Sequence, residues 1–178
     1  MNKSPQINVL YTREQIEATV QRLADEITHD YSRKKPILIG ILKGSFMFLA
    51  DLVRYLDFPL EIEFIRVASY GKNKKTSGKI TAVQGIRTEI KNRHVLVVED
   101  IIDSGLSVNY VLEALRRKKP ASLKVCCLLD KMSRREITVP IDYVGSPVPD
   151  KFLVGYGLDW AEQYRNLPDL CYLEDEKP

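Results

Sequence analysis

Near the middle of the chain, three carboxylates and two hydroxyls follow directly on an apolar run. Residues 95–98 are apolar, Glu99, Asp100 and Asp103 come next, and a Ser-Gly-Leu-Ser turn occupies residues 104–107. Such a run predicts a buried strand of a parallel sheet, and open α/β sheets bind ligands beyond the carboxyl ends of their strands. We therefore expect a site that handles phosphate, metal and a proton together.

The turn at residues 104–107 has a composition that suits an anion, and helical periodicity follows it. Free N–H groups and the positive end of a helix dipole point out of a helix N-terminus. Gly105 allows close approach, and Ser104 and Ser107 add hydroxyl donors. The turn therefore predicts a monophosphate site. The alternative, that Ser107 only caps the helix, leaves the three acids upstream unexplained.

The three acids suit different roles. Neighbouring residues of an ideal strand point to opposite faces, so Glu99 and Asp100 are expected to reach one ligand from two sides. Magnesium is typically held by one or two carboxylates together with phosphate oxygens. Asp103 begins the phosphate turn, close to the reacting carbon of a bound sugar phosphate, where a general base is useful. For each acid alone a solvated loop position is the alternative, and the combination favours a site.

Composition limits the class of protein. The chain has 178 residues, 44% hydrophobic and 29% charged, which is enough for one globular domain with a core. We find no apolar run of membrane-spanning length and no signal-like N-terminal segment, so we expect a cytoplasmic protein without a membrane partner. The net charge of +3 gives little reason to expect nucleic acid. The three cysteines form neither a disulfide framework nor a zinc spacing.

Hydrophobic periodicity predicts strands and helices in alternation. Thr12 and Gln15 form a capping-box pattern before a helix over residues 13–31. Further helices are predicted at 46–56 and 107–117. This order with short turns predicts a doubly wound α/β sheet, mostly parallel and flanked by helices. Its strands are expected at residues 37–42, 60–68, 80–84, 94–98, 123–129 and 141–144.

Two segments lie outside that pattern. Residues 70–79 are polar and basic and contain two glycines, which predicts either an exposed solvated loop or a lid over a site. The C-terminal part, rich in proline, glycine and aromatic residues, predicts a small irregular lobe.

At five places the chain resembles the type I phosphoribosyltransferases, in particular the 6-oxopurine branch, hypoxanthine (guanine) phosphoribosyltransferase. Residues 95–107 resemble the motif that binds phosphoribosyl pyrophosphate, and Leu42-Lys43-Gly44-Ser45 is similar to the pyrophosphate loop. Ser69-Tyr70 resembles the start of the lid, residues 128–131 the strand end that bears a purine-recognising lysine, and residues 150–159 the hood over the base. These motifs occur in the family's order and cover essentially the whole chain.

The resemblance implies a fold and a domain organisation. The fold is that of a type I phosphoribosyltransferase, a mostly parallel sheet flanked by helices with a small hood lobe. A single domain covers residues 1–178, with a core at about 12–146, a hood from about 1–11 and 147–178, and a mobile lid at about 69–82. The resemblance also implies a cis peptide bond between Leu42 and Lys43.

The resemblance also assigns residues to ligands. Asp103 is the general base, acting at the imidazole nitrogen of the purine, and Mg²⁺ is held by Glu99, Asp100 and Asp159. The purine is bound by Lys131, Phe152, Leu153 and Asp159. Phosphoribosyl pyrophosphate is bound by Lys43, Gly44, Ser69, Tyr70, Glu99, Asp100, Asp103, Ser104, Gly105, Leu106, Ser107 and Arg165.

Three of these residues have plainer interpretations. Without the resemblance, Lys43 is a solvated turn lysine. Lys131 follows an apolar strand and would then mark its exit to solvent. Phe152 would be a core residue. In the family role the Lys131 ammonium donates to the exocyclic oxygen of the base, which favours a 6-oxopurine over adenine because a cation has only donors.

The implied activity belongs to purine salvage: transfer of 5-phosphoribosyl from phosphoribosyl pyrophosphate to hypoxanthine and/or guanine, forming IMP or GMP and pyrophosphate. The implied partners are these small molecules and further copies of the chain, as a homodimer or homotetramer. Two alternatives stay open: an enzyme that prefers xanthine and guanine, and an RNA-binding attenuator of a pyrimidine operon with the same fold. Lys131 and the hood favour a purine enzyme over the attenuator, and RNA binding also requires a concentrated basic face.

Overall fold

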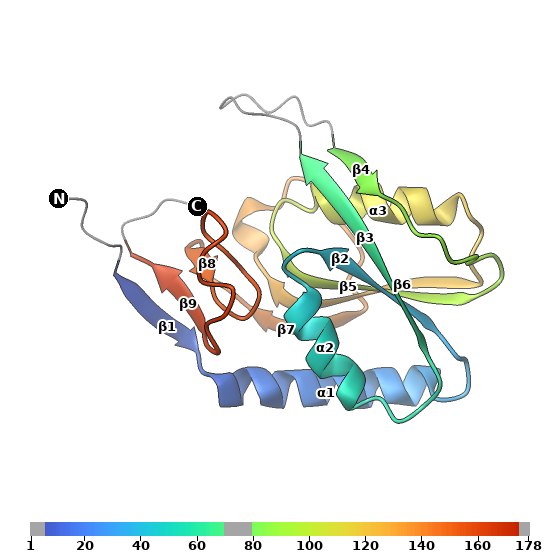
Figure 1. Ribbon diagram of the computed structural model, residues 1–178, viewed down its shortest axis with the longest axis horizontal. Helices are drawn as coiled ribbons and strands as arrows, with labels where there is room; N and C mark the ends of the chain where they lie inside the picture. The colour runs from blue at the N-terminus through green and yellow to red at the C-terminus, as the bar shows by residue number, and fades with distance from the viewer. Residues whose placement is uncertain (1–5, 70–79, 175–178) are drawn as a thin grey trace.

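A six-stranded sheet forms the centre of the computed structural model, which describes residues 6–69 and 80–174 (Figure 1). Its strand order is β4-β3-β2-β5-β6-β7. Five neighbouring strands run parallel, and β4 pairs antiparallel with β3 at one edge. The strands are β2 (Ile37–Leu42), β3 (Glu61–Ser69), β4 (Ile80–Gln84), β5 (His94–Ile102), β6 (Ser122–Asp130) and β7 (Tyr143–Pro147).

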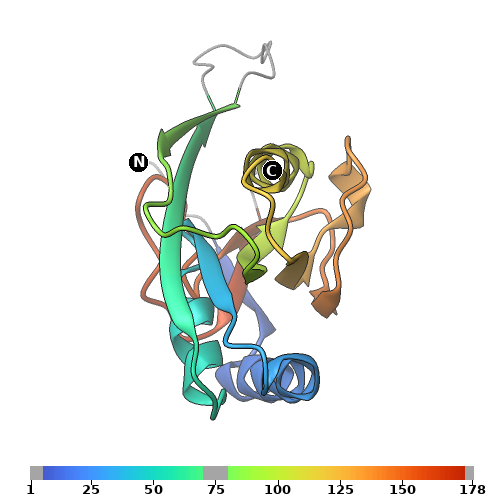
Figure 2. The same cartoon turned by 90° about the vertical axis from the view of Figure 1, so that its right-hand side faces the viewer.

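Helices cover both faces of this sheet. α1 (Arg13–Tyr31) and α2 (Phe46–Arg54) pack on one face, and α3 (Leu106–Arg116) packs on the other (Figure 2). α1 begins with the predicted capping box, in which the Thr12 hydroxyl accepts from the Gln15 N–H at 3.4 Å and the Gln15 side chain accepts from the Thr12 N–H at 2.9 Å. The predicted doubly wound α/β architecture is therefore confirmed.

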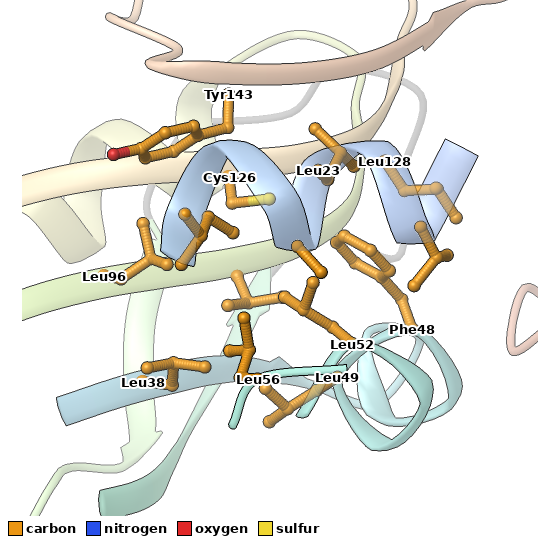
Figure 3. Packing of buried hydrophobic residues seen from close by; sticks show 14 of the residues in the cluster. Leu23, Leu38, Phe48, Leu49, Leu52, Leu56, Leu96, Cys126, Leu128 and Tyr143 are labelled. Carbon is orange, nitrogen blue, oxygen red and sulfur yellow. The ribbon is translucent and has the colours of Figure 1, made fainter. Parts of the chain in front are cut away.

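Period-two alternation along the strands divides the core between the two helical layers. Leu38, Leu96 and Cys126 point toward α1 and α2, where Figure 3 shows them packed with leucines of these helices. Their neighbours Ile37 and Val95 point toward α3. A strand that is buried on both faces becomes a continuous apolar run, which is why the central strands were readable from sequence.

A second sheet joins the two ends of the described chain. It has the order β1-β9-β8, formed antiparallel by β1 (Ile7–Tyr11), β9 (Leu170–Leu173) and β8 (Phe152–Val154). The expectation of an irregular C-terminal lobe was wrong in this respect. Strands of three to five residues are too short for a period-two signal to stand out.

Several predicted boundaries shift. β5 does not end before the acids but continues to Ile102, because Ile101 and Ile102 still pair with β6. α2 ends at Arg54, two residues early. The strand predicted at 141–144 is displaced to Tyr143–Pro147, since the Asp142 carboxylate instead accepts from the Val125 N–H. A short 3-10 helix, Met132–Arg134, follows β6.

Candidate active site

The turn that was expected to bind a phosphate connects the end of β5 to α3. Gly105, at φ +84°, is the residue that caps α3, so the alternative in which Ser107 caps the helix was wrong. A Cβ on Gly105 would lie 2.4 Å from the Ile137 carbonyl oxygen, which leaves room only for glycine. The Leu106 N–H donates to the Ser104 hydroxyl at 3.3 Å. A hollow of about 100 Å³ opens here, lined by Glu99, Ile101, Ile102, Asp103, Ser104, Gly105, Ser107 and Val108.

A second hollow, of about 150 Å³, lies beside the first. It is lined by Ile101, Asp103, Lys131, Lys151, Phe152 and Leu153. Ile101 and Asp103 line both hollows. The Asp103 carboxylate therefore stands where the two hollows meet, one at a helix N-terminus and the other beside a buried ammonium.

Lys131 is that buried ammonium. Its side chain is 3% exposed. Its Nζ donates to the Lys151 carbonyl at 3.0 Å and lies 3.4 Å from Oδ1 of Asp150 and 3.8 Å from Oδ2 of Asp103. The plainer interpretation, in which this lysine marks an exit to solvent, was wrong. A buried ammonium aimed into a hollow is a hydrogen-bond donor for a ligand oxygen.

Asp103 combines a partly paired and an unpaired oxygen. Oδ2 faces the Lys131 ammonium, whereas Oδ1 is buried and has no hydrogen-bond partner within the described residues. A buried acceptor without a donor costs about 1–3 kcal/mol, so it is expected to find its donor in a ligand. The geometry suits acceptance of a proton from a bound ligand.

Glu99 and Asp100 lie on opposite sides of β5. Glu99 lines the hollow at α3, and its Oε2 is buried without a hydrogen-bond partner in the described structure. Burial raises the Glu99 pKa well above its ordinary value, and the neighbouring Asp100 adds to this. Burial likewise raises the pKa of Asp100 to about 6. A ligand that supplies hydroxyl donors or positive charge would therefore stabilise the ionised form of both carboxyls.

The Lys43-Gly44 turn joins β2 to α2 beside Asp100. The peptide bond between Leu42 and Lys43 is cis, as the family resemblance implied. A Cβ on Gly44 would lie 1.7 Å from Oδ2 of Asp100, so the backbone itself lies against that carboxylate. The Lys43 Nζ forms an ion pair with Glu162 at 2.7 Å and is 45% exposed.

Arg165 braces the C-terminal loop, which packs against this turn. Its Nη1 donates to the Gly157 carbonyl at 2.8 Å, and its Nη2 lies 2.6 Å from Oδ1 of Asp159 and 3.3 Å from Glu162. Gly157 in turn packs on Gly44, since a Cβ there would meet the Gly44 carbonyl oxygen at 2.3 Å. Arg165 and Lys43 are thus linked through Glu162, with which both form ion pairs.

Comparison with known proteins identifies this arrangement. The family model of the phosphoribosyl transferase domain matches residues 7–161. The hypoxanthine-guanine phosphoribosyltransferase of Aquifex aeolicus is 47% identical over 97% of this chain and 98% of its own length. That of Bacillus subtilis is 45% identical over 93% of this chain and 92% of its own length. The chain belongs to the hypoxanthine-guanine phosphoribosyltransferase family.

A solved structure in this family agrees in fold. The crystal structure of a hypoxanthine-guanine phosphoribosyltransferase from Bacillus anthracis has a TM-score of 0.89 at 41% identity and covers 96% of this chain and 99% of its own. The type I phosphoribosyltransferase fold predicted from the motifs is therefore confirmed, as is membership of the branch named hypoxanthine (guanine) phosphoribosyltransferase.

Most residues assigned from the family motifs come together at the carboxyl ends of the parallel strands, as expected for an open α/β sheet. Ser69 ends β3, and Tyr70 lies outside the described residues, as do residues 71–79 of the expected lid. Phe152 and Leu153 lie on β8 and line the hollow that contains Lys131. Phe152 is half-buried rather than a core residue.

Two residues at the site were not predicted from the sequence. Glu162 binds both Lys43 and Arg165, and Arg135 binds the backbone of the turn at Asp103. Both occur in polar segments that are typical of solvated loops, so no local signal distinguished them. Only the return of the C-terminal loop and of the segment after β6 brings them to the site.

In the described part of the phosphoribosyltransferase, no group of three or more His, Cys, Asp or Glu side chains is arranged so that it could hold a metal ion. Within the same residues no helix has the length and apolarity to cross a membrane. The unpartnered Glu99 oxygen nevertheless fits a metal ion whose remaining ligands come from substrate and water.

Proposed function

We propose that this phosphoribosyltransferase transfers the 5-phosphoribosyl group of phosphoribosyl pyrophosphate to hypoxanthine and/or guanine, forming IMP or GMP and pyrophosphate. The meeting of two hollows at Asp103 carries the proposal. A sugar phosphate anchored at the α3 N-terminus and a base beside Lys131 would bring their reacting atoms together next to that carboxylate. The names of the curated relatives support the same substrates.

The donor would be held at both of its charged ends. Backbone N–H groups of residues 103–107 would bind the 5-phosphate at the start of α3. Lys43, Gly44 and Arg165 would bind the pyrophosphate, with Glu162 released from the two cations. Glu99 and Asp100 would accept hydrogen bonds from the ribose hydroxyls. Ser69 and Tyr70 would contribute from the lid.

The base would lie in the hollow lined by Lys131 and Phe152. The ammonium of Lys131 donates to the exocyclic oxygen of a 6-oxopurine and repels the amino group of adenine. Phe152 would stack on the ring. Leu153 and Asp159 would contribute to recognition of its edge.

Asp103 would act as the general base. Attack of the purine nitrogen on the ribose carbon generates positive charge on the base, which is relieved when Asp103 accepts the proton of the imidazole ring. The ribose passes through an oxocarbenium-like state that water readily traps. A lid at about residues 69–82 would exclude water from it.

Magnesium fits the chemistry of this site. Glu99, Asp100 and Asp159 would hold Mg²⁺, with the remaining ligands from the donor and water. The ion would neutralise the charge that develops on the leaving pyrophosphate. Asp159 would be available once an anion draws Arg165 away from it.

Organisation and setting complete the proposal. The chain would be a single domain with a core at about 12–146 and a hood from about 1–11 and 147–178, working in the cytoplasm as a homodimer or homotetramer. Its partners would be phosphoribosyl pyrophosphate and the purine, without nucleic acid or membrane.

The test is a spectrophotometric assay of the purified chain with phosphoribosyl pyrophosphate, Mg²⁺ and each purine in turn. Nucleotide formation with hypoxanthine or guanine, none with adenine, and loss on chelation of Mg²⁺ are expected. A preference for xanthine would change the proposed acceptor from hypoxanthine or guanine to xanthine. One solved relative (40% identical, TM-score 0.82) is named a hypoxanthine-guanine-xanthine phosphoribosyltransferase. Tight, salt-sensitive RNA binding without nucleotide formation would overturn the proposal.

A further inference from the structure

The segment that follows β6 binds the carbonyl side of the phosphate turn. The Ser104 carbonyl accepts from the N–H groups of Glu136 and Ile137, both at 3.0 Å, and the Ile102 carbonyl accepts from the Lys131 N–H at 3.1 Å. The Ile137 carbonyl oxygen lies 2.4 Å from the position that a Cβ on Gly105 would take. Residues 131–137 therefore form a close backing for the turn.

Arg135 completes this backing with a side chain. Its Nε donates to the Asp103 carbonyl at 3.0 Å and its Nη2 to the Ile102 carbonyl at 3.1 Å. The Nη2 also forms an ion pair with Asp130, and the side chain is 17% exposed. The guanidinium is thus fixed by two successive carbonyls, at the end of β5 and the start of the turn, and by one carboxylate, an arrangement that suits its planar fork of donors.

We call the backbone N–H groups of residues 103–107, which are proposed to bind the 5-phosphate, the 5-phosphate cradle. Each carbonyl that Arg135 holds shares a peptide unit with one of these N–H groups. In a trans peptide the C=O and the next N–H point in opposite directions. A donor that holds the carbonyls of Ile102 and Asp103 therefore turns the N–H groups of Asp103 and Ser104 away from itself. A charged donor also polarises those peptide units, which makes their N–H groups better donors to an anion.

We propose that Arg135 is a positioning residue of the 5-phosphate cradle, acting through the two peptide units on either side of Asp103. It touches no substrate. It directs and polarises N–H groups toward the 5-phosphate and fixes the backbone from which Asp103 reaches the purine. This role rests on the proposed function of the same site.

Arg135→Gln and Arg135→Lys test the role, with Arg116→Gln, at the exposed end of α3, as the matched control. Arg135→Gln loses two charge-assisted hydrogen bonds, so the KM for phosphoribosyl pyrophosphate is expected to rise about 10-fold or more. The KM for hypoxanthine changes much less. Arg135→Lys keeps the charge but not the fork, so its KM for the donor rises by a smaller factor.

A third variant, Arg135→Ala, distinguishes the positioning role from a general structural role by chemical rescue. Millimolar guanidinium or ethylguanidinium is expected to restore part of its donor affinity, whereas equal concentrations of ammonium are not. Calorimetric binding of ribose 5-phosphate, which needs no turnover, is expected to weaken in the same order as the donor KM. If the wild type binds ribose 5-phosphate but forms no nucleotide, the proposed function fails while the positioning role stands.

Two results would overturn the positioning role. The first is that Arg135→Gln keeps the wild-type KM for the donor and the wild-type affinity for ribose 5-phosphate. The second is that Arg135→Gln and the folded Arg135→Lys both raise the KM for the donor and the KM for hypoxanthine by the same factor. The melting temperature of each variant, measured alongside, identifies any that does not fold, and the conclusion then rests on Arg135→Lys.

Discussion

The backbone of Gly44 lies against the carboxylate of Asp100, so closely that a Cβ on Gly44 would be 1.7 Å from Oδ2. The two residues come from different strand ends, Gly44 after β2 and Asp100 within β5. Asp100 is buried, and Arg165 and Asp159 act on its charge from the C-terminal loop. The turn proposed for pyrophosphate and the acid proposed for ribose and metal therefore form one packed unit.

Gly44→Ala is expected to lower activity sharply. The added methyl displaces either the Asp100 carboxylate or the turn, and a displacement of about 1 Å at a catalytic site costs on the order of 10²-fold in rate. Steady-state kinetics with varied donor measures the loss. Gly85→Ala is the matched control, because a Cβ at Gly85 meets nothing within 4 Å. Equal activity of the two variants would contradict the packed unit.

Asp100 is expected to make the ligand-free protein less stable as the pH rises. Its pKa is raised by burial from 3.8 to about 6, so between these values the folded chain holds a proton that the unfolded chain has lost. The free energy of unfolding therefore falls as the pH rises from about 4 to about 6, and this contribution is constant above that range.

Asp100→Asn isolates that contribution. Denaturant unfolding across the same pH range is expected to give a flatter profile for the variant, and a higher free energy of unfolding than the wild type at neutral pH. Glu99, whose pKa is also raised, keeps a slope of the same sign in both proteins. Parallel profiles for the two proteins would show that Asp100 does not titrate in this range.

Thr12→Ala is expected to affect stability and not catalysis. Thr12 and Gln15 satisfy each other's backbone N–H groups at the start of α1. Loss of such a cap costs about 1 kcal/mol and lowers the melting temperature of a chain of this size by about 2–4 °C. The matched change in the interior of the same helix, Thr19→Ala, removes no cap. Calorimetry that gave both variants the same melting temperature would contradict the role of the capping box.

The sheet and α1 could be predicted because their signals are local. Central strands such as β2 are buried on both faces and appear as unbroken apolar runs, and the Thr12–Gln15 box marks the start of α1 within four residues. The hood strands could not be predicted, because β8 has three residues and its partner β9 is recognisable only once paired with β1.

The residues of the candidate site likewise fall into those with a local sequence signal and those without one. The acid run and the turn at residues 104–107 carried their chemistry in consecutive residues, so they were predicted from type and spacing. Lys43, Lys131 and Arg165 needed the family resemblance, since each alone suits a solvated lysine or arginine. Glu162 and Arg135 are brought to the site only by long-range packing, and nothing within a few residues of either indicates the carbonyl or cation that it binds.

Lys131→Met is expected to weaken binding of the base far more than that of the donor. The Lys131 side chain is 3% exposed and lines the same hollow as Phe152, and a hydrogen bond from a charged donor contributes about 1.5–3 kcal/mol. The KM for hypoxanthine should therefore rise about 10- to 100-fold, with a smaller fall in kcat because Asp103 loses its facing cation. The same substitution at the exposed Lys118 is the control. A larger change in the donor KM than in the purine KM, measured by varying each substrate at saturation of the other, would place Lys131 in the donor site instead.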